Sequence, residues 1–180
     1  MSKKKKKAEK RSVGREILSW VLYLGAAVVI ATVIKTFLFQ LIEVKGTSML
    51  ETLQNGDRLY VSILTSRLNG YDRGDIVICV YPGADHDCVK RVVAIPGDTV
   101  KVDHGVVYVN GEAQEENYLT YLAGYSTEEV TLGEGEYYVL GDNRPVSHDS
   151  HSADVGVVTE IVGEVRAVIW PPARIGSKLK

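Results

Sequence analysis

Length, composition and charge limit what this chain can be. Its 180 residues have room for one ordinary domain with a tail or an anchor, and 45% hydrophobic with 24% charged residues is normal for a protein with a core. The net charge of −2 conceals an asymmetry, because residues 1–15 carry eight Lys or Arg and one Glu, which leaves −9 for the remainder. This acidic remainder argues against a nucleic-acid-binding protein, so we expect no nucleic-acid partner.

An uncharged apolar run follows the basic residues. It extends from Ile17 to Ile34, and as a helix its 18 residues would span about 27 Å, close to a bilayer's hydrocarbon thickness of about 30 Å. The apolar pattern resumes after Lys35 and reaches Ile42. A cleaved secretory signal peptide is the alternative, but its apolar region is shorter and ends in small residues, whereas this run ends in bulky ones. We therefore predict a membrane anchor with an interfacial segment over residues 16–42.

The charges around this segment predict its orientation. Lysines precede it and acidic residues follow it, so the positive-inside rule makes residues 1–15 a basic cytoplasmic tail and residues 43–180 an extracytoplasmic domain. No later segment is long and apolar enough to cross back. The sequence thus predicts a single-pass protein of the cell membrane, with the lipid bilayer as a partner.

Residues beyond the anchor have the pattern of β-strands. Runs rich in Val, Ile and Tyr alternate with turn-forming pairs, and Asn110-Gly111 after such a run is typical of a tight hairpin. This spacing favours an antiparallel β domain, sandwich or barrel-like, over βαβ units. The predicted strands are Arg58–Ile63, Asp75–Tyr81, Cys88–Ile95, Thr99–Val102, Val106–Val109, Glu136–Leu140 and Glu164–Trp170.

Two residues are candidates for the chemistry, Ser48 and Lys90. Ser48 stands two residues after Gly46, in the stretch 46–53, and comes soon after the anchor, so it should lie near the membrane surface. Lys90 stands at the start of an apolar strand, where its side chain can point into the domain. Burial disfavours the ammonium form, and a neutral amine beside a serine can accept the serine proton. These residues fit the Ser-Lys form of nucleophile and base.

A polar stretch at residues 141–150 could orient such groups or could be a solvated loop. Here His148, with nearby His151, raises the possibility of a Ser-His-Asp triad, and with His86 and His104 that of a metal site. Neither has supporting spacing, since no HExxH motif occurs and the last two histidines lie in turn-like surroundings. We therefore expect no metal and no cofactor.

The two cysteines, Cys79 and Cys88, flank a turn-like stretch at residues 81–85 and would lie in an oxidising compartment. They would either form a disulfide across a hairpin or serve as two small buried hydrophobic residues. The sequence leaves both interpretations open.

Four short motifs follow the apolar run in order. They are Ser48-Met49-x-x-Thr52-Leu53, Gly74-Asp75-Ile76-Val77, Lys90-Arg91…Pro96-Gly97-Asp98 and Gly141-Asp142-Asn143-Arg144…Ser147-x-Asp149-Ser150. In this order they resemble the signature motifs of bacterial type I signal peptidases. One motif would be a weak signal, but four in order behind an anchor are a strong one. The resemblance covers roughly residues 15–175, including the closing 169–172, and is greatest to the Gram-positive form.

The resemblance implies a signal-peptidase-like antiparallel β fold and a membrane-bound serine endopeptidase that removes signal peptides from exported preproteins. Ser48 would be the nucleophile, its backbone N–H part of the oxyanion hole, and Lys90 the general base. Ser147 would position the Lys90 amine. The remaining supporting residues that it implies are Asp142, Arg144 and Asp149 for the loop and Met49 for the pocket. Secretory preproteins with small residues before the cut would be the partners.

This chain departs from the family pattern at two positions, Glu51 and His151, and at a third it lacks a group that only some relatives have. Some relatives carry a hydroxyl two residues before the nucleophile, and Gly46 has none. Glu51 replaces the usual proline, which loses the stiffening of that turn and, near Lys90, would favour the charged amine. His151 replaces the usual arginine beside Asp149, and histidine makes that charge pair only when protonated.

Other classes of protein remain as alternatives. A non-catalytic relative, acting as an assembly or chaperone-like factor for surface proteins, would keep the fold and anchor but usually lose Ser48 or Lys90, and both are present. A soluble self-cleaving repressor-type protease with Ser-Lys chemistry is disfavoured by the membrane span. The enzyme is the favoured interpretation.

Overall fold

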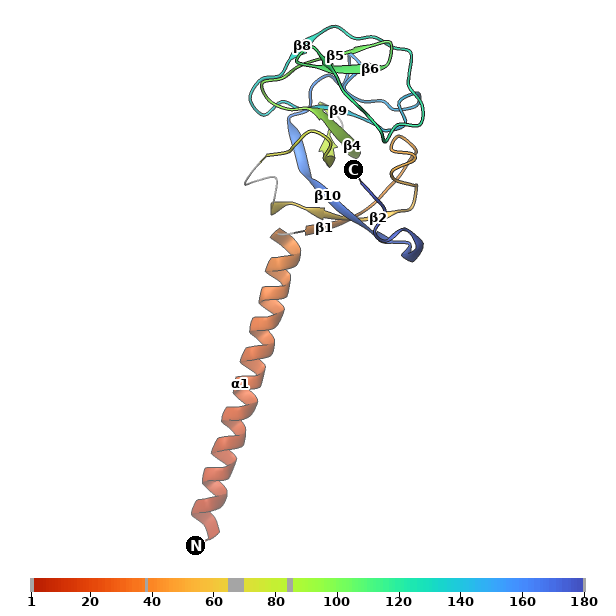
Figure 1. Ribbon diagram of the computed structural model, residues 1–180. Coiled ribbons are helices and arrows are strands. Elements are labelled where there is room, and N and C mark those ends of the chain that lie inside the picture. Colours follow the sequence, from red (N-terminus) through yellow and green to blue (C-terminus); the bar gives the residue numbers. More distant parts are fainter. Residues whose placement is uncertain (1, 38, 65–69, 84–85, 180) are drawn as a thin grey trace. The chain divides into compact units, whose positions relative to one another are not determined.

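The computed structural model describes residues 2–37, 39–64, 70–83 and 86–179, and the chain divides into two compact units, residues 1–38 and 39–180. The first unit is a single helix, α1 (Ser2–Phe37) (Figure 1). Its segment Val13–Thr32 is long and apolar enough to cross a membrane, and large side chains such as Trp20 and Leu24 are exposed. Exposed apolar side chains on a helix of this length are suited to contact with lipid, so the segment is consistent with a single membrane span.

The second unit is built on a six-stranded antiparallel sheet in the order β1-β2-β10-β3-β4-β9. β1 therefore lies at one end of the sheet and β9 at the other. The strands, in this order, are β1 (Phe39–Glu43), β2 (Arg58–Ser62), β10 (Glu160–Trp170), β3 (Ile76–Val80), β4 (Asp87–Ala94) and β9 (Tyr138–Leu140).

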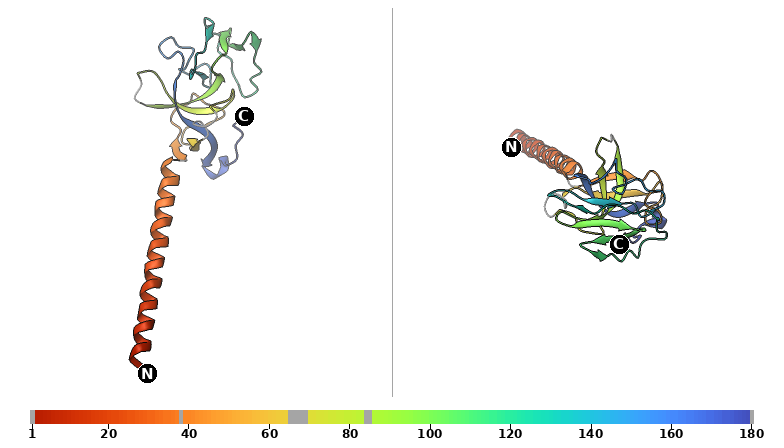
Figure 2. Two further views of the ribbon diagram at one scale, coloured as in Figure 1. Left: turned by 90° about the vertical axis from the view of Figure 1, so that its left-hand side faces the viewer. Right: turned by 90° about the horizontal axis from the view of Figure 1, so that it is seen from above.

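A smaller antiparallel sheet, in the order β7-β6-β5-β8, lies at the β4–β9 end of the larger one (Figures 1 and 2). Its strands are β5 (Thr99–Asp103), β6 (Val106–Val109), β7 (Glu112–Ala113) and β8 (Val130–Thr131). Asn110 and Gly111 join β6 to β7 with φ of 55° and 81°, as the predicted tight hairpin requires. A short 3-10 helix, η1 (Pro172–Arg174), follows β10.

The predicted fold class, a mainly antiparallel β domain behind one apolar N-terminal helix, is confirmed. Each of the seven predicted strands overlaps an observed one. The prediction missed β1, which falls within the segment assigned to the anchor and interface, as well as the two-residue strands β7 and β8. It also began β10 too late, at Glu164 instead of Glu160.

Gly163 explains why the predicted strand began later than β10 does. The register against β3 shifts between Ile161 and Gly163, which interrupts the alternation that marks a strand in sequence. A Cβ at Gly163 would lie 2.7 Å from the carbonyl oxygen of Ser62 in β2. The glycine therefore allows β10 to lie closely between its two neighbours.

Two core clusters fix the parts of the domain that carry the candidate groups. Met49 and Leu53, 2% and 0% exposed, are inserted into a cluster with residues of β2, β3 and β10, and this holds the turn that contains Ser48. A second cluster joins Val77 and Cys79 of β3 to Val92 of β4 and Val139 of β9, so it supports the strand that carries Lys90. Both groups are thus attached to packed elements.

Candidate active site

Lys90 is a buried lysine in the middle of β4. It lies opposite Val77 of β3 in the register, and only 3% of it is exposed. Burial lowers the pKa of the Lys90 amine below its ordinary value, although the negative charge of Asp149 opposes this shift. The Nζ atom donates a hydrogen bond to Ser147 Oγ at 2.9 Å. This amine is therefore both oriented and biased toward its neutral form.

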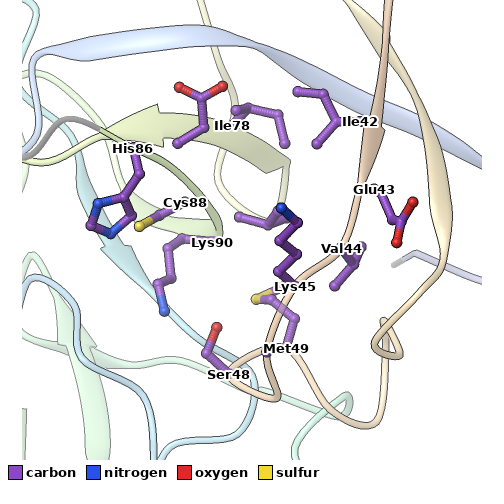
Figure 3. Close-up of a pocket in the computed structure, with 13 residues that line it drawn as sticks. Ile42, Glu43, Val44, Lys45, Ser48, Met49, Ile78, His86, Cys88 and Lys90 are labelled. Carbon is purple, nitrogen blue, oxygen red and sulfur yellow. The ribbon is translucent and has the colours of Figure 1, made fainter.

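Ser48 lies in the turn between β1 and β2 and shares a cavity of about 420 Å³ with Lys90. Figure 3 shows the hydroxyl of Ser48 and the amine of Lys90 pointing toward one another across this cavity. The chain that leads to Ser48 turns at Gly46, whose φ of +98° lies in a region where a residue with a Cβ atom is strained. The backbone at Gly46 therefore favours glycine, and a hydroxyl-bearing residue there would carry strain.

The polar loop 141–150 is fastened directly to the Ser48 turn. The backbone N–H of Asn143 donates to the Ser48 carbonyl oxygen at 2.9 Å, and its side-chain amide donates to the Thr47 carbonyl oxygen at 3.0 Å. A Cβ at Gly141 would lie 2.2 Å from Ser147 Oγ and 2.5 Å from the Ser48 carbonyl oxygen. Glycine thus allows the loop and the turn to come into direct contact.

Asp149 is the negative end of a chain of hydrogen bonds that begins at Lys90. Its Oδ2 accepts hydrogen bonds from Ser147 Oγ and from the backbone N–H of Gly141, the latter at 2.8 Å, and its Oδ1 lies 2.6 Å from His151 Nδ1. Burial alone would raise the pKa of this carboxyl, but the bonds from His151, Ser147 and Gly141 and the charge of Lys90 hold it below its usual range. Asp149 is therefore a charged acceptor that fixes the Ser147 hydroxyl.

Asp142 is bound by Arg91. The motif contains Arg91, but the sequence analysis gave it no role. The two side chains form a buried bidentate pair, with Nε to Oδ1 at 2.9 Å and Nη2 to Oδ2 at 2.6 Å. Thr52 Oγ1 also donates to Asp142 at 2.5 Å. Arg91 further donates to the carbonyl oxygen of Leu179 at 2.9 Å. This network ties the loop, β4, the Ser48 turn and the C-terminal segment together.

Arg144 and Met49 also have well-defined positions. The Arg144 guanidinium donates to the Gly141 carbonyl oxygen at 3.1 Å and forms an ion pair with Glu116, and both side chains are almost wholly buried. Met49 is 2% exposed and lines the same cavity as Ser48 and Lys90. The structure therefore brings Ser48, Met49, Lys90 and Ser147 to one place. The other predicted site residues, Asp142, Arg144 and Asp149, make hydrogen bonds around them.

His148 and His151 contact different aspartates. His148 is exposed, and its Nε2 lies 3.0 Å from Asp154, while its carbonyl oxygen accepts a hydrogen bond from the Tyr81 hydroxyl. His151 contacts Asp149 and stacks on Tyr125. Among the residues that the structure describes, no group of three or more His, Cys, Asp and Glu side chains could hold a metal ion.

The remaining predictions concern Glu51 and the cysteines. Glu51 is exposed and lines a separate cavity with Tyr118 and Lys178, away from the one that holds Lys90. Cys79 and Cys88 are directly opposite each other in the β3–β4 register, as a hairpin disulfide would need, but both are free thiols. Cys79 belongs to the core and Cys88 is packed against it.

Comparison with known proteins places this geometry in context. The family model described as "Signal peptidase, peptidase S26" matches residues 17–170. Signal peptidase IB of Staphylococcus aureus (strain COL) is 33% identical over 175 residues, which cover 87% of this chain and 91% of the relative. The probable signal peptidase I-2 of Synechocystis sp. is 37% identical over 158 residues, covering 83% and 72%. A crystal structure of a signal peptidase I from Enterococcus faecalis matches with a TM-score of 0.47 and 30% identity over 53% of this chain and 97% of that one.

Proposed function

This chain belongs to the signal peptidase family, peptidase S26, and from that premise we propose that it cuts signal peptides from exported preproteins with Ser48 as nucleophile and Lys90 as general base. The observation that carries the proposal is the buried Lys90 amine in the same cavity as the Ser48 hydroxyl. Because burial lowers the pKa of this amine, a larger fraction of it is neutral and able to take a proton than for an exposed lysine.

The reaction is an acyl transfer in two steps. Lys90 Nζ takes the proton from Ser48 Oγ, and the oxygen attacks the carbonyl carbon of the residue before the cut. The protonated Lys90 then gives its proton to the leaving amine of the mature protein, which leaves the signal peptide esterified to Ser48. Lys90 next takes a proton from water, and the hydroxide attacks the carbonyl carbon of the ester. The bond from that carbon to Ser48 Oγ then breaks, Ser48 Oγ takes the proton back from Lys90, and the signal peptide leaves with a free carboxyl group. Ser147 holds the amine in line for each transfer through its hydrogen bond at 2.9 Å.

The developing negative charge on the substrate oxygen needs donors. The backbone N–H of Ser48 is our candidate for one of them, and Gly46 offers no side-chain hydroxyl as another. The hydrogen bond from the Asn143 side-chain amide to the Thr47 carbonyl oxygen holds the peptide plane that contains the Ser48 N–H, and the bond from the Asn143 backbone N–H to the Ser48 carbonyl oxygen holds the next plane. The turn therefore presents its donor and its nucleophile in a fixed arrangement.

The residues before the cut would bind as an added strand. β1 is an end strand of the larger sheet, and β9 pairs with β4 only from Arg91 to Ala94 among the described strands. The edge of β4 from Asp87 to Lys90 and the chain from Ile42 to Gly46 both line the first cavity. An extended peptide can pair with such edges. Apolar side chains of Ile42, Val44, Met49 and Ile78 line the same cavity and leave space for small residues.

The anchor would keep the enzyme and its substrate in one plane. In this proposal α1 crosses the membrane once, residues 1–15 stay in the cytoplasm, and the β domain works on the outer surface. A preprotein held by its own apolar segment presents its cleavage site near the bilayer, so a shared membrane plane reduces the search. A membrane-impermeant amine reagent on intact cells should label Lys178 in the domain and spare Lys3–Lys7, and the reverse would contradict this orientation.

Cleavage of a preprotein with an A-x-A site, with the enzyme in liposomes, tests the chemistry. The wild type should cut after the last small residue, Ser48→Ala and Lys90→Ala should not, and Lys101→Ala in β5 should cut normally as a control for loss of a lysine. If the folded wild type fails to cut, the non-catalytic alternative is favoured. If cutting survives Lys90→Ala, the base is another group, and His148 is then the next candidate.

A further inference from the structure

Two cavities meet at Ser48. The first, of about 420 Å³, is bounded by β1 and β4 as described above. The second, of about 430 Å³, lies against the loop after β3 and the polar loop, and includes Tyr81, Val146, His148, Asp154 and Val155. Both are lined by the same five residues, Gly46, Ser48, His86, Cys88 and Lys90. The nucleophile therefore stands at the junction of two cavities.

A peptide bond that is cut has chain on both sides. If the residues before the cut occupy the first cavity, where strand edges are available, the chain that follows must leave Ser48 in another direction. The second cavity opens from the same five residues and is lined by loops instead of strand edges. Its position beside Ser48 and Lys90 fits the part of the substrate that follows the cut.

Among the described residues that line the second cavity, one side chain is acidic, that of Asp154. The Asp154 side chain is 72% exposed, and its partner His148 at 3.0 Å is 61% exposed, so an incoming side chain can reach both. The His148 backbone is held by the Tyr81 hydroxyl at 2.9 Å. Val146, 60% exposed, and Tyr81 add apolar surface beside the charge. The site therefore combines a carboxylate with apolar surface for an aliphatic stem, which is the chemistry that lysine and arginine side chains suit.

We propose that the second cavity binds the first residues of the mature protein and that Asp154 makes this site favour basic over acidic side chains there. This inference rests on the proposed function, since it assigns the other half of the same substrate. It makes Asp154 a specificity-determining residue with no part in proton transfer.

A cross-linking experiment tests the placement without requiring turnover. Full-length Ser48→Ala protein in liposomes is mixed with a preprotein that carries a photoreactive residue either two positions after the cut or three positions before it. The first probe should attach to residues 146–155 or 81–83, and the second to residues 42–45 or 86–89. Attachment of the first probe to residues 42–45 would overturn the assignment, and this result does not depend on whether the wild type cleaves the preprotein.

A charge exchange tests the role of Asp154. Preproteins carry Lys or Asp at each of the first three positions after the cut, and kcat/KM is compared at pH 8, where histidine side chains are mostly neutral. At one or more positions, wild type should favour Lys over Asp by about threefold to tenfold, as exposed charge pairs allow. Asp154→Asn should bring that ratio close to one, and Asp154→Lys should invert it.

Asp103 provides the matched control. It is a half-exposed aspartate beside a histidine, His104, at 3.8 Å, but it lies in the smaller sheet and lines neither cavity. Asp103→Asn and Asp103→Lys should leave the Lys-to-Asp ratio unchanged. Equal changes in the Asp103 and Asp154 variants would show a general charge effect and overturn the proposal. A Lys-to-Asp ratio that stays the same in the Asp154 variants would overturn it as well. Failure of wild type to cut any preprotein would instead overturn the proposed function.

Discussion

The amine of Lys90 and the hydroxyl of Ser147 are joined by a hydrogen bond of 2.9 Å, although 56 residues separate them in the sequence. Ser147 in turn donates to Asp149, which is wholly buried. The Ser147 hydroxyl thus uses its proton on the carboxylate and offers a lone pair to the amine.

Ser147→Ala should therefore lower kcat and change KM little. The amine would lose the acceptor that orients it, and since a positioned base contributes roughly 10²–10⁴-fold, we expect a loss of about 10- to 100-fold. Steady-state kinetics on the A-x-A preprotein measures this. Ser150→Ala is the control, because Ser150 is a buried serine of the same loop whose hydroxyl accepts from the Val139 N–H and does not contact Lys90. Equal losses in both variants would indicate a purely structural role for Ser147.

Lys90→Met should make the protein inactive and more stable. The lysine is 3% exposed and its amine is poorly solvated, so an apolar side chain of similar length removes that cost, and we expect a gain of about 1–3 kcal/mol in the free energy of unfolding. Denaturant unfolding of the two proteins gives this difference.

The pH dependence of that gain has a definite sign. A lysine whose folded pKa is lowered binds fewer protons when folded than when unfolded, so wild-type stability rises with pH between the folded pKa and the unfolded value of about 10.4. The advantage of Lys90→Met should be largest below the folded pKa and should shrink as the pH rises through this window. A difference that is constant with pH would mean that the Lys90 pKa is not lowered.

His151→Arg should make the stability less sensitive to alkaline pH. His151 lies 2.6 Å from Asp149, and histidine carries a positive charge only when protonated, whereas arginine carries it at every accessible pH. Melting temperatures from pH 6 to pH 9 would show a smaller decline for the variant. Parallel declines would show that the Asp149 contact works equally well with neutral histidine.

Glu51→Pro should leave activity unchanged or raise it. Glu51 is exposed and lines a cavity away from Lys90, so removing its carboxylate should not alter the base, and proline restricts the turn after Ser48. Initial rates across pH would test this, with Glu51→Gln separating the charge from the ring. A collapse of activity in the proline variant alone would show that this turn requires a backbone that proline prevents.

Titration of the denatured protein should find two free thiols with and without reductant. Cys79 and Cys88 are paired across the strands but are not joined, and burial raises the pKa of Cys79 to about 12, which leaves little of the reactive thiolate. Burial also raises the pKa of Cys88. Thiols that appear only after reduction would show that the hairpin closes into a disulfide.

Much of this site could be predicted from sequence because its chemistry is concentrated in short motifs. Ser48, Lys90 and Ser147 are recognisable by residue type and order, and Val-rich alternation identified β4, the strand that carries Lys90. The role of Arg91 could not be foreseen in the same way, since its partners come from three distant places, Gly74, Asp142 and the carbonyl oxygen of Leu179. Long-range hydrogen bonds to backbone atoms leave no signal in residue identity.

β1 was missed for a related reason. Its residues are apolar and directly continue the pattern of the anchor, so hydropathy alone cannot mark the end of α1 at Phe37. Only pairing with β2, from Phe39 opposite Ser62 to Glu43 opposite Arg58, makes it a strand. Likewise, the exposed Asp154 lies outside every motif and gains interest only from the cavity beside Ser48.

Gly141 allows the loop 141–150 and the Ser48 turn to lie closer together than any other residue would. A single methyl group at its Cα would overlap both Ser147 Oγ and the Ser48 carbonyl oxygen, so any larger residue would force the two segments apart. The room between the loop and the Ser48 turn at this point is therefore smaller than one carbon atom, and a larger residue is excluded by steric repulsion from the Ser147 side chain and the Ser48 backbone. Steric repulsion does not weaken with salt or pH, so a residue larger than glycine should be excluded here even under conditions that disrupt the surrounding charge pairs.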